Sequence, residues 1–143
     1  MSTDAGRPQL PPDMNAFNAR LIEEFRANHG LLSGQMAGRQ VLLLTTTGAK
    51  SFMPRTVVIG YRLYGERFAA IASANGAEKA PAWFHNLLAN PVATIELGPD
   101  TFQVKARVAA PEERPELARV VEYYQSQQAL ISREIPFVVF EKV

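Results

Sequence analysis

The chain has 143 residues, a net charge of +1 and an apolar content of 47%, which is the size and composition of one folded domain. It has no cysteine and only two histidines, His29 and His85, so disulfides and thiolate metal sites are excluded and we expect no metal centre. Charges of both signs are interspersed and no apolar run approaches the roughly 18 residues of a membrane span. We therefore expect neither a nucleic-acid-binding protein nor a transmembrane one.

The first predicted elements are a polar tail and an amphipathic helix. Residues 1–12 hold three prolines and few apolar groups, which predicts a flexible tail before a single domain at residues 13–143. From Asp13, a good N-cap residue, apolar side chains recur at helical spacing until Gly30, which suits a left-handed C-terminal cap. These apolar positions are Met14, Phe17, Leu21, Ile22 and Phe25. The pattern predicts a helix of about four turns that covers a core.

Short runs rich in β-branched and aromatic residues follow, and they predict antiparallel strands joined by tight turns. The predicted strands cover residues 41–44, 55–64, 67–73, 92–97, 101–109 and 137–140. Turn signals at Gly65-Glu66 and Gly98-Pro99-Asp100 predict hairpins between neighbouring strands.

Two further helices are predicted at residues 81–90 and 111–133, the second with an apolar stripe of Leu117, Val120, Val121 and Tyr124. Closing the sheet into a small barrel would bury one face and protect the edges. We therefore predict an α+β fold, a small antiparallel β-barrel of about six strands with packed helices.

The segment between the first two strands, residues 42–55, is the most informative part of the chain. An apolar strand runs into a glycine-containing turn that carries two cations, Lys50 and Arg55. Backbone N–H groups, neighbouring hydroxyls and these charges would converge on an anionic ligand. The hydroxyls belong to Thr45, Thr46, Thr47 and Ser51. A P-loop is excluded because the first glycine of that motif is missing, and an incidental polar turn stays the alternative.

A second passage, from a strand into the predicted helix at 81–90, has a similar character. Its polar residues are Ser73, Asn75, Gly76, Lys79 and Asn86. The N-terminus of the new helix adds a favourable field for anions. Trp83 could contribute an aromatic wall, with core packing as the alternative, and for His85 we expect an ordinary surface or capping role.

In combination, these segments make the chain similar to the deazaflavin-dependent nitroreductase family from about residue 17 to residue 139. The motifs that carry the resemblance are Phe-Asn at 17–18, Glu-Phe-Arg-Ala-Asn-His-Gly at 24–30, Leu-Leu-Leu-Thr-Thr-Thr-Gly-Ala-Lys-Ser at 42–51, Pro-Arg-Thr at 54–56, Ala-Ser at 72–73, Gly-Ala-Glu-Lys-Ala-Pro-Ala-Trp-Phe-His-Asn-Leu at 76–87, Ala-Asn-Pro at 89–91 and Arg-Glu-Ile-Pro at 133–136. The family consists of small split-barrel proteins that bind the deazaflavin coenzyme F-420.

The resemblance implies an oxidoreductase that passes a hydride from reduced coenzyme F-420 to a small electron-poor acceptor, such as a quinone, an enone or a nitro compound. It implies that the phosphate and carboxylate tail of the cofactor is held by Gly48, Ala49, Lys50, Ser51 and Arg55. The neighbouring wall would be formed by Ala72, Ser73, Lys79, Trp83 and Asn86. Tyr124 is the candidate catalytic residue over the substrate, because a phenol can donate a proton; filling the core is the alternative.

Phe52 departs from the family pattern, since glycine is frequent at this position. It keeps open a second class of function, a non-catalytic carrier of deazaflavin or of a lipophilic ligand, and binding of FMN is a third alternative. We expect a cytoplasmic protein, peripheral to the membrane if the acceptor is a quinone. Exposed edge strands and small size also make a homodimer a prediction.

Overall fold

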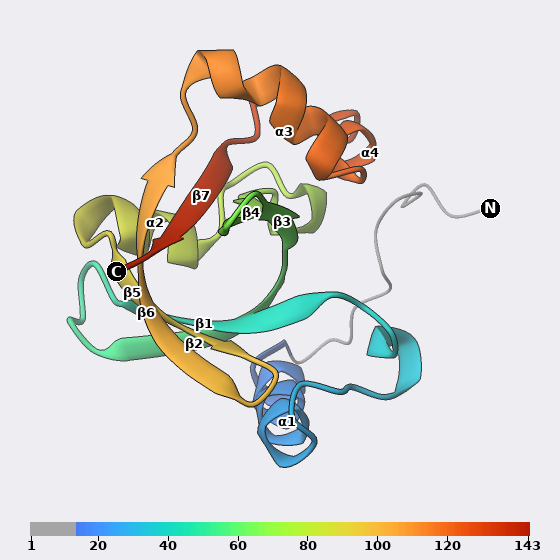
Figure 1. Cartoon of the computed structure of the whole chain (residues 1–143), viewed down its shortest axis with the longest axis vertical. Helices are drawn as coiled ribbons and strands as arrows, with labels where there is room; N and C mark the ends of the chain where they lie inside the picture. The colour runs from blue at the N-terminus through green and yellow to red at the C-terminus, as the bar shows by residue number, and fades with distance from the viewer. Residues whose placement is uncertain (1–13) are drawn as a thin grey trace.

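The computed structural model describes residues 14–143, so the predicted tail at 1–12 and the Asp13 cap lie outside the described residues (Figure 1). The helices are α1 (Met14–Ala27), α2 (Ala82–Ala89), α3 (Arg114–Val120) and α4 (Tyr124–Gln128), with short 3₁₀ turns η1 (Gly34–Met36), η2 (Ala74–Gly76) and η3 (Pro111–Glu113). The strands are β1 (Val41–Thr47), β2 (Pro54–Gly60), β3 (Arg62–Tyr64), β4 (Arg67–Ile71), β5 (Val92–Leu97), β6 (Asp100–Val108) and β7 (Phe137–Lys142).

The strands form one seven-stranded antiparallel sheet in the order β2-β1-β5-β6-β7-β4-β3. β2 and β3 lie at opposite ends of this order, yet only Tyr61 separates them in the chain. The sheet must therefore curl until its two edges meet at this residue, whose N–H donates to the Gln40 carbonyl at 3.2 Å. The single strand predicted at 55–64 was wrong for this reason: the β-type pattern continues through the bend while the pairing partner changes from β1 to β4.

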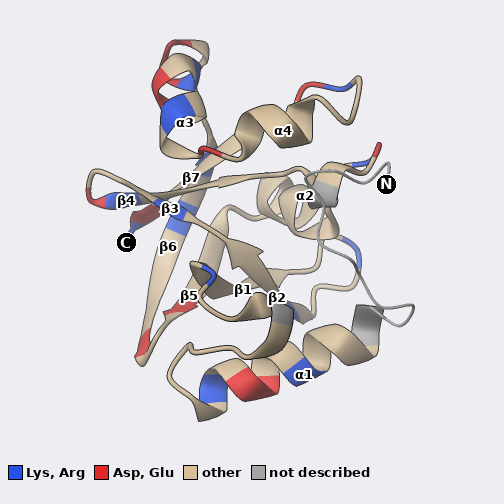
Figure 2. Cartoon of the chain, turned by 90° about the vertical axis from the view of Figure 1, so that its right-hand side faces the viewer, with Lys and Arg blue, Asp and Glu red and all other residues tan. Residues whose placement is uncertain are grey.

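The C-terminal end of α1 is capped as the sequence predicts. The Gly30 N–H donates to the Phe25 carbonyl at 2.8 Å, and His29 and Gly30 both have positive φ, +54° and +93°. A Cβ at Gly30 would lie 3.0 Å from Gly98 Cα in the β5–β6 turn, so the cap also needs glycine for its close approach to the sheet. The helix runs below β1 and β2 with charges of both signs on it (Figure 2).

The core lies on both faces of the central strands, because β4 and β7 alternate between two apolar clusters. Ala70 and Val138 point into the curled sheet, whereas Ala69 and Val139 pack outward under α3 and α4. The single helix predicted at 111–133 was wrong, since Val121 has φ −95° and ψ 82° and separates α3 from α4. Figure 1 shows these two helices at one end of the molecule and α1 at the other.

Among residues 14–143, no helix has the length and apolar character needed to cross a bilayer. In the same part of the chain, no cluster of three or more His, Asp or Glu side chains is arranged to hold a metal ion.

Glu113 connects β6 to the turn that starts α3. Its carboxylate accepts hydrogen bonds from Arg107 at 2.6 and 3.1 Å, from the Ala110 N–H at 2.9 Å and from the Tyr64 hydroxyl at 3.1 Å. The charge-assisted bond from Arg107 is the main cause that lowers the pKa of Glu113 from 4.5 to about 2. The ionised carboxylate therefore stabilises the fold.

We predict that acid removes this contribution. Because the folded-state pKa lies below the ordinary value, the stabilisation is complete above about pH 4.5 and is lost as the pH falls toward 2. Glu113→Gln should lower the free energy of unfolding at pH 7 because it removes the charge that Arg107 pairs with. The loss should be only about 1 kcal/mol, because Arg107 is partly exposed and solvent screens the ion pair. The substitution should also flatten the acid limb of a denaturation series. The exposed neighbour variant Glu112→Gln is the control, and equal acid limbs in both variants would contradict the assignment.

Candidate functional site

A cavity of about 1020 Å³ opens between α1, the β1–β2 hairpin and α2. This volume is at the upper end of the range of small-molecule and cofactor sites, roughly 300–1,000 Å³. Seven of the predicted cofactor residues line it: Gly48, Ala49, Lys50, Ser51, Arg55, Trp83 and Asn86. Two segments far apart in sequence, the β1–β2 turn predicted to bind an anion and the helix that follows the second passage, therefore line one cavity.

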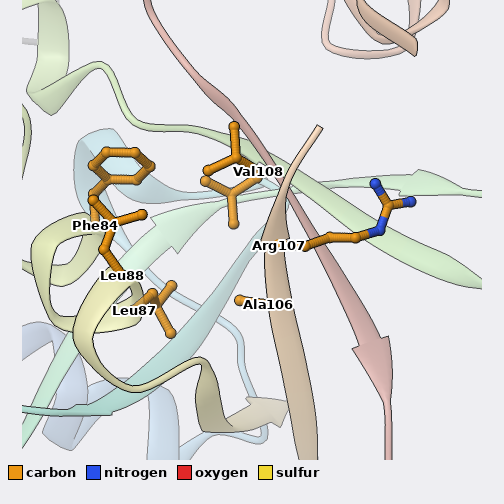
Figure 3. A pocket seen from close by; sticks show the side chains of 7 residues that line it. Phe84, Leu87, Leu88, Ala106, Arg107 and Val108 are labelled. Atoms are coloured by element: carbon orange, nitrogen blue, oxygen red, sulfur yellow. The ribbon is translucent and has the colours of Figure 1, made fainter. Parts of the chain in front are cut away.

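A second pocket lies between α2, β6 and β7, but its volume is only about 40 Å³. Figure 3 shows its apolar lining, including Phe84, Leu87 and Val108, with the guanidinium of Arg107 directed away from them. It is too small for a cofactor and offers no convergent polar groups, so the larger cavity is the candidate site.

The β1–β2 turn is held in shape by its own backbone. The Gly48 N–H donates to the Met53 carbonyl at 2.8 Å, the Phe52 N–H donates to the Gly48 carbonyl at 3.0 Å, and the Met53 N–H donates to Ser51 Oγ at 3.2 Å. A Cβ at Gly48 would clash with Ser51 Oγ and lie 3.2 Å from the Met53 carbonyl oxygen, so a side chain there would displace the Ser51 hydroxyl and crowd the turn. No partner among the described residues accepts from the N–H groups of Lys50 and Ser51, which leaves both as donors for a ligand.

Asn86 of α2 joins the helix to this turn. Its side chain is buried, its Oδ1 accepts from the Ala49 N–H at 2.9 Å, and its Nδ2 donates to Thr46 Oγ1 at 3.0 Å. The Ala49 N–H is therefore already used within the protein, unlike the free donor that the sequence suggested. Asn86 fixes the distance between the two walls of the cavity.

The charge of the site is positive. Lys50 and Arg55 are exposed at the rim, neither forms an ion pair with a described residue, and no Asp or Glu is among the lining residues of the chain from 14 to 143. An anion at this rim would therefore meet two cations and no carboxylate from that part of the chain. Of the four predicted hydroxyls, those of Thr46 and Ser51 belong to lining residues, whereas Thr45 pairs with Thr56 at 2.7 Å.

Three predicted wall residues, Ala72, Ser73 and Lys79, are not among the residues that line the cavity. Ala72 and Ser73 are buried, and the guanidinium of Arg133 donates to the carbonyls of Ala72, Ser73 and Ala77 at 3.1, 3.1 and 3.2 Å. Arg133 thus holds the segment that leads into α2 through hydrogen bonds to its backbone carbonyls. A contact of these three residues with the cofactor stays a prediction.

Tyr124 also lies apart from the cavity lining, at the start of α4. Its ring packs on Phe137 with a centroid separation of 4.5 Å, within the cluster on the outer face of β4 and β7. Its hydroxyl accepts from Arg114 at 3.0 Å and donates to Gln128 Oε1 at 3.4 Å. The catalytic role of Tyr124 stays a prediction that these contacts do not favour.

Sequence reasoning missed the contribution of α1. Asn18, Ala19 and Ile22 line the cavity, although the stripe of this helix was expected only to cover a core. His85, expected to have no special role, lines it as well. The Phe-Asn motif at 17–18 was the signal in the sequence that α1 contributes to the cavity, because Asn18 is one of the lining residues.

The donor set fits a large anionic cofactor with an aromatic ring system, because it combines two rim cations, free amide donors, Trp83 and the apolar Ile22 and Val57. Residues 19–142 match the family model described as F420H(2)-dependent quinone reductase. This chain belongs to that family. The predicted relationship to deazaflavin-dependent reductases is confirmed, and the family model specifies quinone reduction.

Individual relatives agree with this assignment. An F420H(2)-dependent quinone reductase of Mycobacterium tuberculosis is 35% identical over 127 residues, which cover 82% of this chain and 85% of that protein. The solved structure of an F420-H2 dependent reductase superposes with a TM-score of 0.63 at 31% identity and covers 72% of this chain and 95% of that one. A structure described as a domain-swapped dimer has a TM-score of 0.65 at 27% identity, covering 90% of this chain and 100% of that one. The predicted α+β split barrel is confirmed.

We predict that Asn86→Ala separates the two walls of this site. Loss of the bonds to Ala49 and Thr46 leaves the buried Thr46 hydroxyl and the partly buried Ala49 N–H without these partners, which should cost about 1–3 kcal/mol in the free energy of unfolding. The affinity for reduced coenzyme F-420, measured by fluorescence titration, should fall as well. Asn90→Ala is the matched control, because Asn90 is an exposed asparagine at the end of the same helix. Equal affinities in the two variants would contradict the role given to Asn86.

Proposed function

We propose that this protein transfers a hydride from reduced coenzyme F-420 to a quinone. The observation that carries the proposal is the cavity between α1, the β1–β2 hairpin and α2, which has two cations at its rim and, among the described residues, no carboxylate in its lining. Family membership supports the choice of cofactor and acceptor, because the description of the family names both F420H(2) and quinone reduction.

In this proposal, Lys50, Ser51 and Arg55 bind the anionic tail of the cofactor. Gly48 and Ala49 set the backbone conformation of the turn, so that the amides of Lys50 and Ser51 face the ligand. Trp83 and Asn86 form the opposite wall, and we place Ala72, Ser73 and Lys79 in the same wall beside the cofactor, on the segment whose carbonyls accept from Arg133.

The cofactor, when bound, supplies the hydride and so carries the difficult chemical step. The protein's own contribution is orientation and exclusion of water. Asn86 and Arg133 keep α2 and the β1–β2 turn at a fixed separation, and the apolar side chains of Ile22, Val57 and Trp83 lower the water content beside the ring system. Reduction of the quinone also takes up a proton. The sequence suggested the Tyr124 hydroxyl as its donor, but this hydroxyl is bonded to Arg114 and Gln128 and Tyr124 is not among the cavity-lining residues, so the proposal does not depend on it.

Two alternatives remain distinct in their outcomes. A non-catalytic carrier would bind coenzyme F-420 or a lipophilic ligand and show no turnover with any quinone. An FMN protein would bind FMN tightly and deazaflavin weakly. The exposed Phe52 was the reason to consider a carrier, and it does not line the cavity.

The proposal also covers the oligomeric state of the protein and its location in the cell. A related structure is described as a domain-swapped dimer, which supports a homodimer for this chain too. We place the activity in the cytoplasm, at the membrane surface when the acceptor is a membrane quinone.

Removal of either rim cation is predicted to weaken cofactor binding. Lys50→Ala or Arg55→Ala should cost roughly 1.5–3 kcal/mol, or about one to two decades in Kd, because each removes a charge-assisted contact. Titration with reduced coenzyme F-420 measures the change, and the loss should shrink at high salt. Lys105→Ala, which removes an exposed lysine on β6, is the control. An unchanged Kd in both rim variants would refute the binding site.

A second variant tests the proton donor. The Tyr124 hydroxyl is bonded to Arg114 and Gln128, so we expect Tyr124→Phe to cost about 1 kcal/mol of stability and to leave kcat close to that of the wild type. Steady-state reduction of a water-soluble naphthoquinone measures this. If kcat instead falls by about 10²–10⁴-fold with cofactor affinity unchanged, Tyr124 is the proton donor after all.

A further inference from the structure

His85 is the third basic side chain that lines the cavity, after Lys50 and Arg55. No Asp, Glu, Tyr or further basic residue is among the described residues of this lining. His85 is exposed, and no described residue forms a hydrogen bond or an ion pair with its ring. Both nitrogens of the imidazole are therefore open to a ligand in the cavity.

The direction of His85 follows from the helical spacing of α2. His85 and Asn86 lie three and four residues after Ala82, which places the three on one face of the helix, and all three line the cavity. The buried Asn86 anchors this face on the β1–β2 turn, because its Oδ1 accepts from the Ala49 N–H at 2.9 Å. Lys50 is the next residue of that turn. The face of α2 that carries His85 is thus fixed against the turn that carries Lys50.

The charges in the cavity favour an anion as the partner of His85. The hairpin contributes the cations of Lys50 and Arg55, whereas the lining residues of α1 carry no titratable group. Histidine is the side chain that changes its charge between pH 5 and 8. A nearby anion favours the protonated imidazole, which can then donate a charge-assisted hydrogen bond to it.

We infer that His85 is a third anion-binding residue of this site, and that it takes up a proton from solvent when the anionic tail of the cofactor binds. The inference rests on the proposed function, because it takes coenzyme F-420 as the anion. Linkage is reciprocal, so protonation of His85 must tighten binding by the factor by which binding favours protonation. The affinity should therefore rise as the pH falls from about 8 to about 5.5, a range in which lysine and arginine side chains stay charged.

The test is isothermal titration calorimetry of the full chain with reduced coenzyme F-420, in pairs of buffers that differ in their heat of ionisation. The buffer dependence of the binding heat gives the number of protons taken up per cofactor. Wild-type protein should take up a fraction of one proton at about pH 6.5. Its Kd should fall by about threefold between pH 8 and pH 5.5, because one exposed ion pair is gained. Groups of the cofactor that titrate contribute to every variant, so the comparison is made between variants.

Three variants separate the charge of His85 from its shape. His85→Gln should keep the wild-type Kd of pH 8 but lose the proton uptake and the pH dependence that the wild type shows beyond the cofactor's own. His85→Lys carries a positive charge throughout the series, so it should bind with the tighter affinity at every pH and take up no additional proton. His29→Asn is the matched control, because His29 is the other histidine of the chain, is exposed and is not a lining residue. Asparagine suits its φ of +54°, and this variant should behave as the wild type does.

The inference is overturned if the wild type takes up no more protons than His85→Gln, or if His29→Asn loses as much proton uptake as His85→Gln. It is also overturned if His85→Lys keeps the pH dependence of the wild type. Proton-linked binding without reduction of a water-soluble naphthoquinone would support the inference and refute the proposed function. Absence of cofactor binding at every pH would overturn both.

Discussion

The architecture depends on one constraint: the two edge strands of the sheet, β2 and β3, are consecutive in the chain. A single residue, Tyr61, separates them, so a flat sheet with these strands at opposite ends is impossible. The sheet curls, its inner face becomes a closed apolar core, and its outer face along β4 and β7 is left for α3 and α4 to cover. The two edge strands, β2 and β3, are brought together at Tyr61.

The same curl decides where a ligand can bind. The β1–β2 hairpin extends beyond the core, α1 packs along β2, and α2 packs along β1, so that the three enclose a cavity. Asn86 and Arg133 then fix α2 from two sides, one through the hairpin and the other through the segment that precedes the helix. A cofactor that carries the chemical step itself depends more on a rigid, positively charged binding site than on a set of catalytic side chains.

Much of this could be predicted from the sequence, because local signals were strong. Gly65 and Gly98 marked their hairpins, and Lys50 and Arg55 marked a turn that lines the cavity, while anion binding by this turn stays a prediction. Gly60 stands directly before the bend at Tyr61, but the β-type pattern continues on both sides of it, and the break at Val121 has no glycine or proline beside it, so each pattern was predicted as one element. Helical spacing showed that α1 and the Tyr124 region each have an apolar face, but it could not say that α1 borders a cavity while Tyr124 packs on Phe137. Those facts depend on contacts between distant segments.

The position of β7 has a consequence for biosynthesis. This strand follows every other described element in the chain, yet it lies between β6 and β4 and pairs with both. Until it leaves the ribosome, the earlier strands can form only separate sets, β2-β1-β5-β6 and β4-β3, with exposed apolar faces. The native sheet must therefore assemble late, after translation of residues 137–142, and the apolar faces of the two sets stay exposed until then.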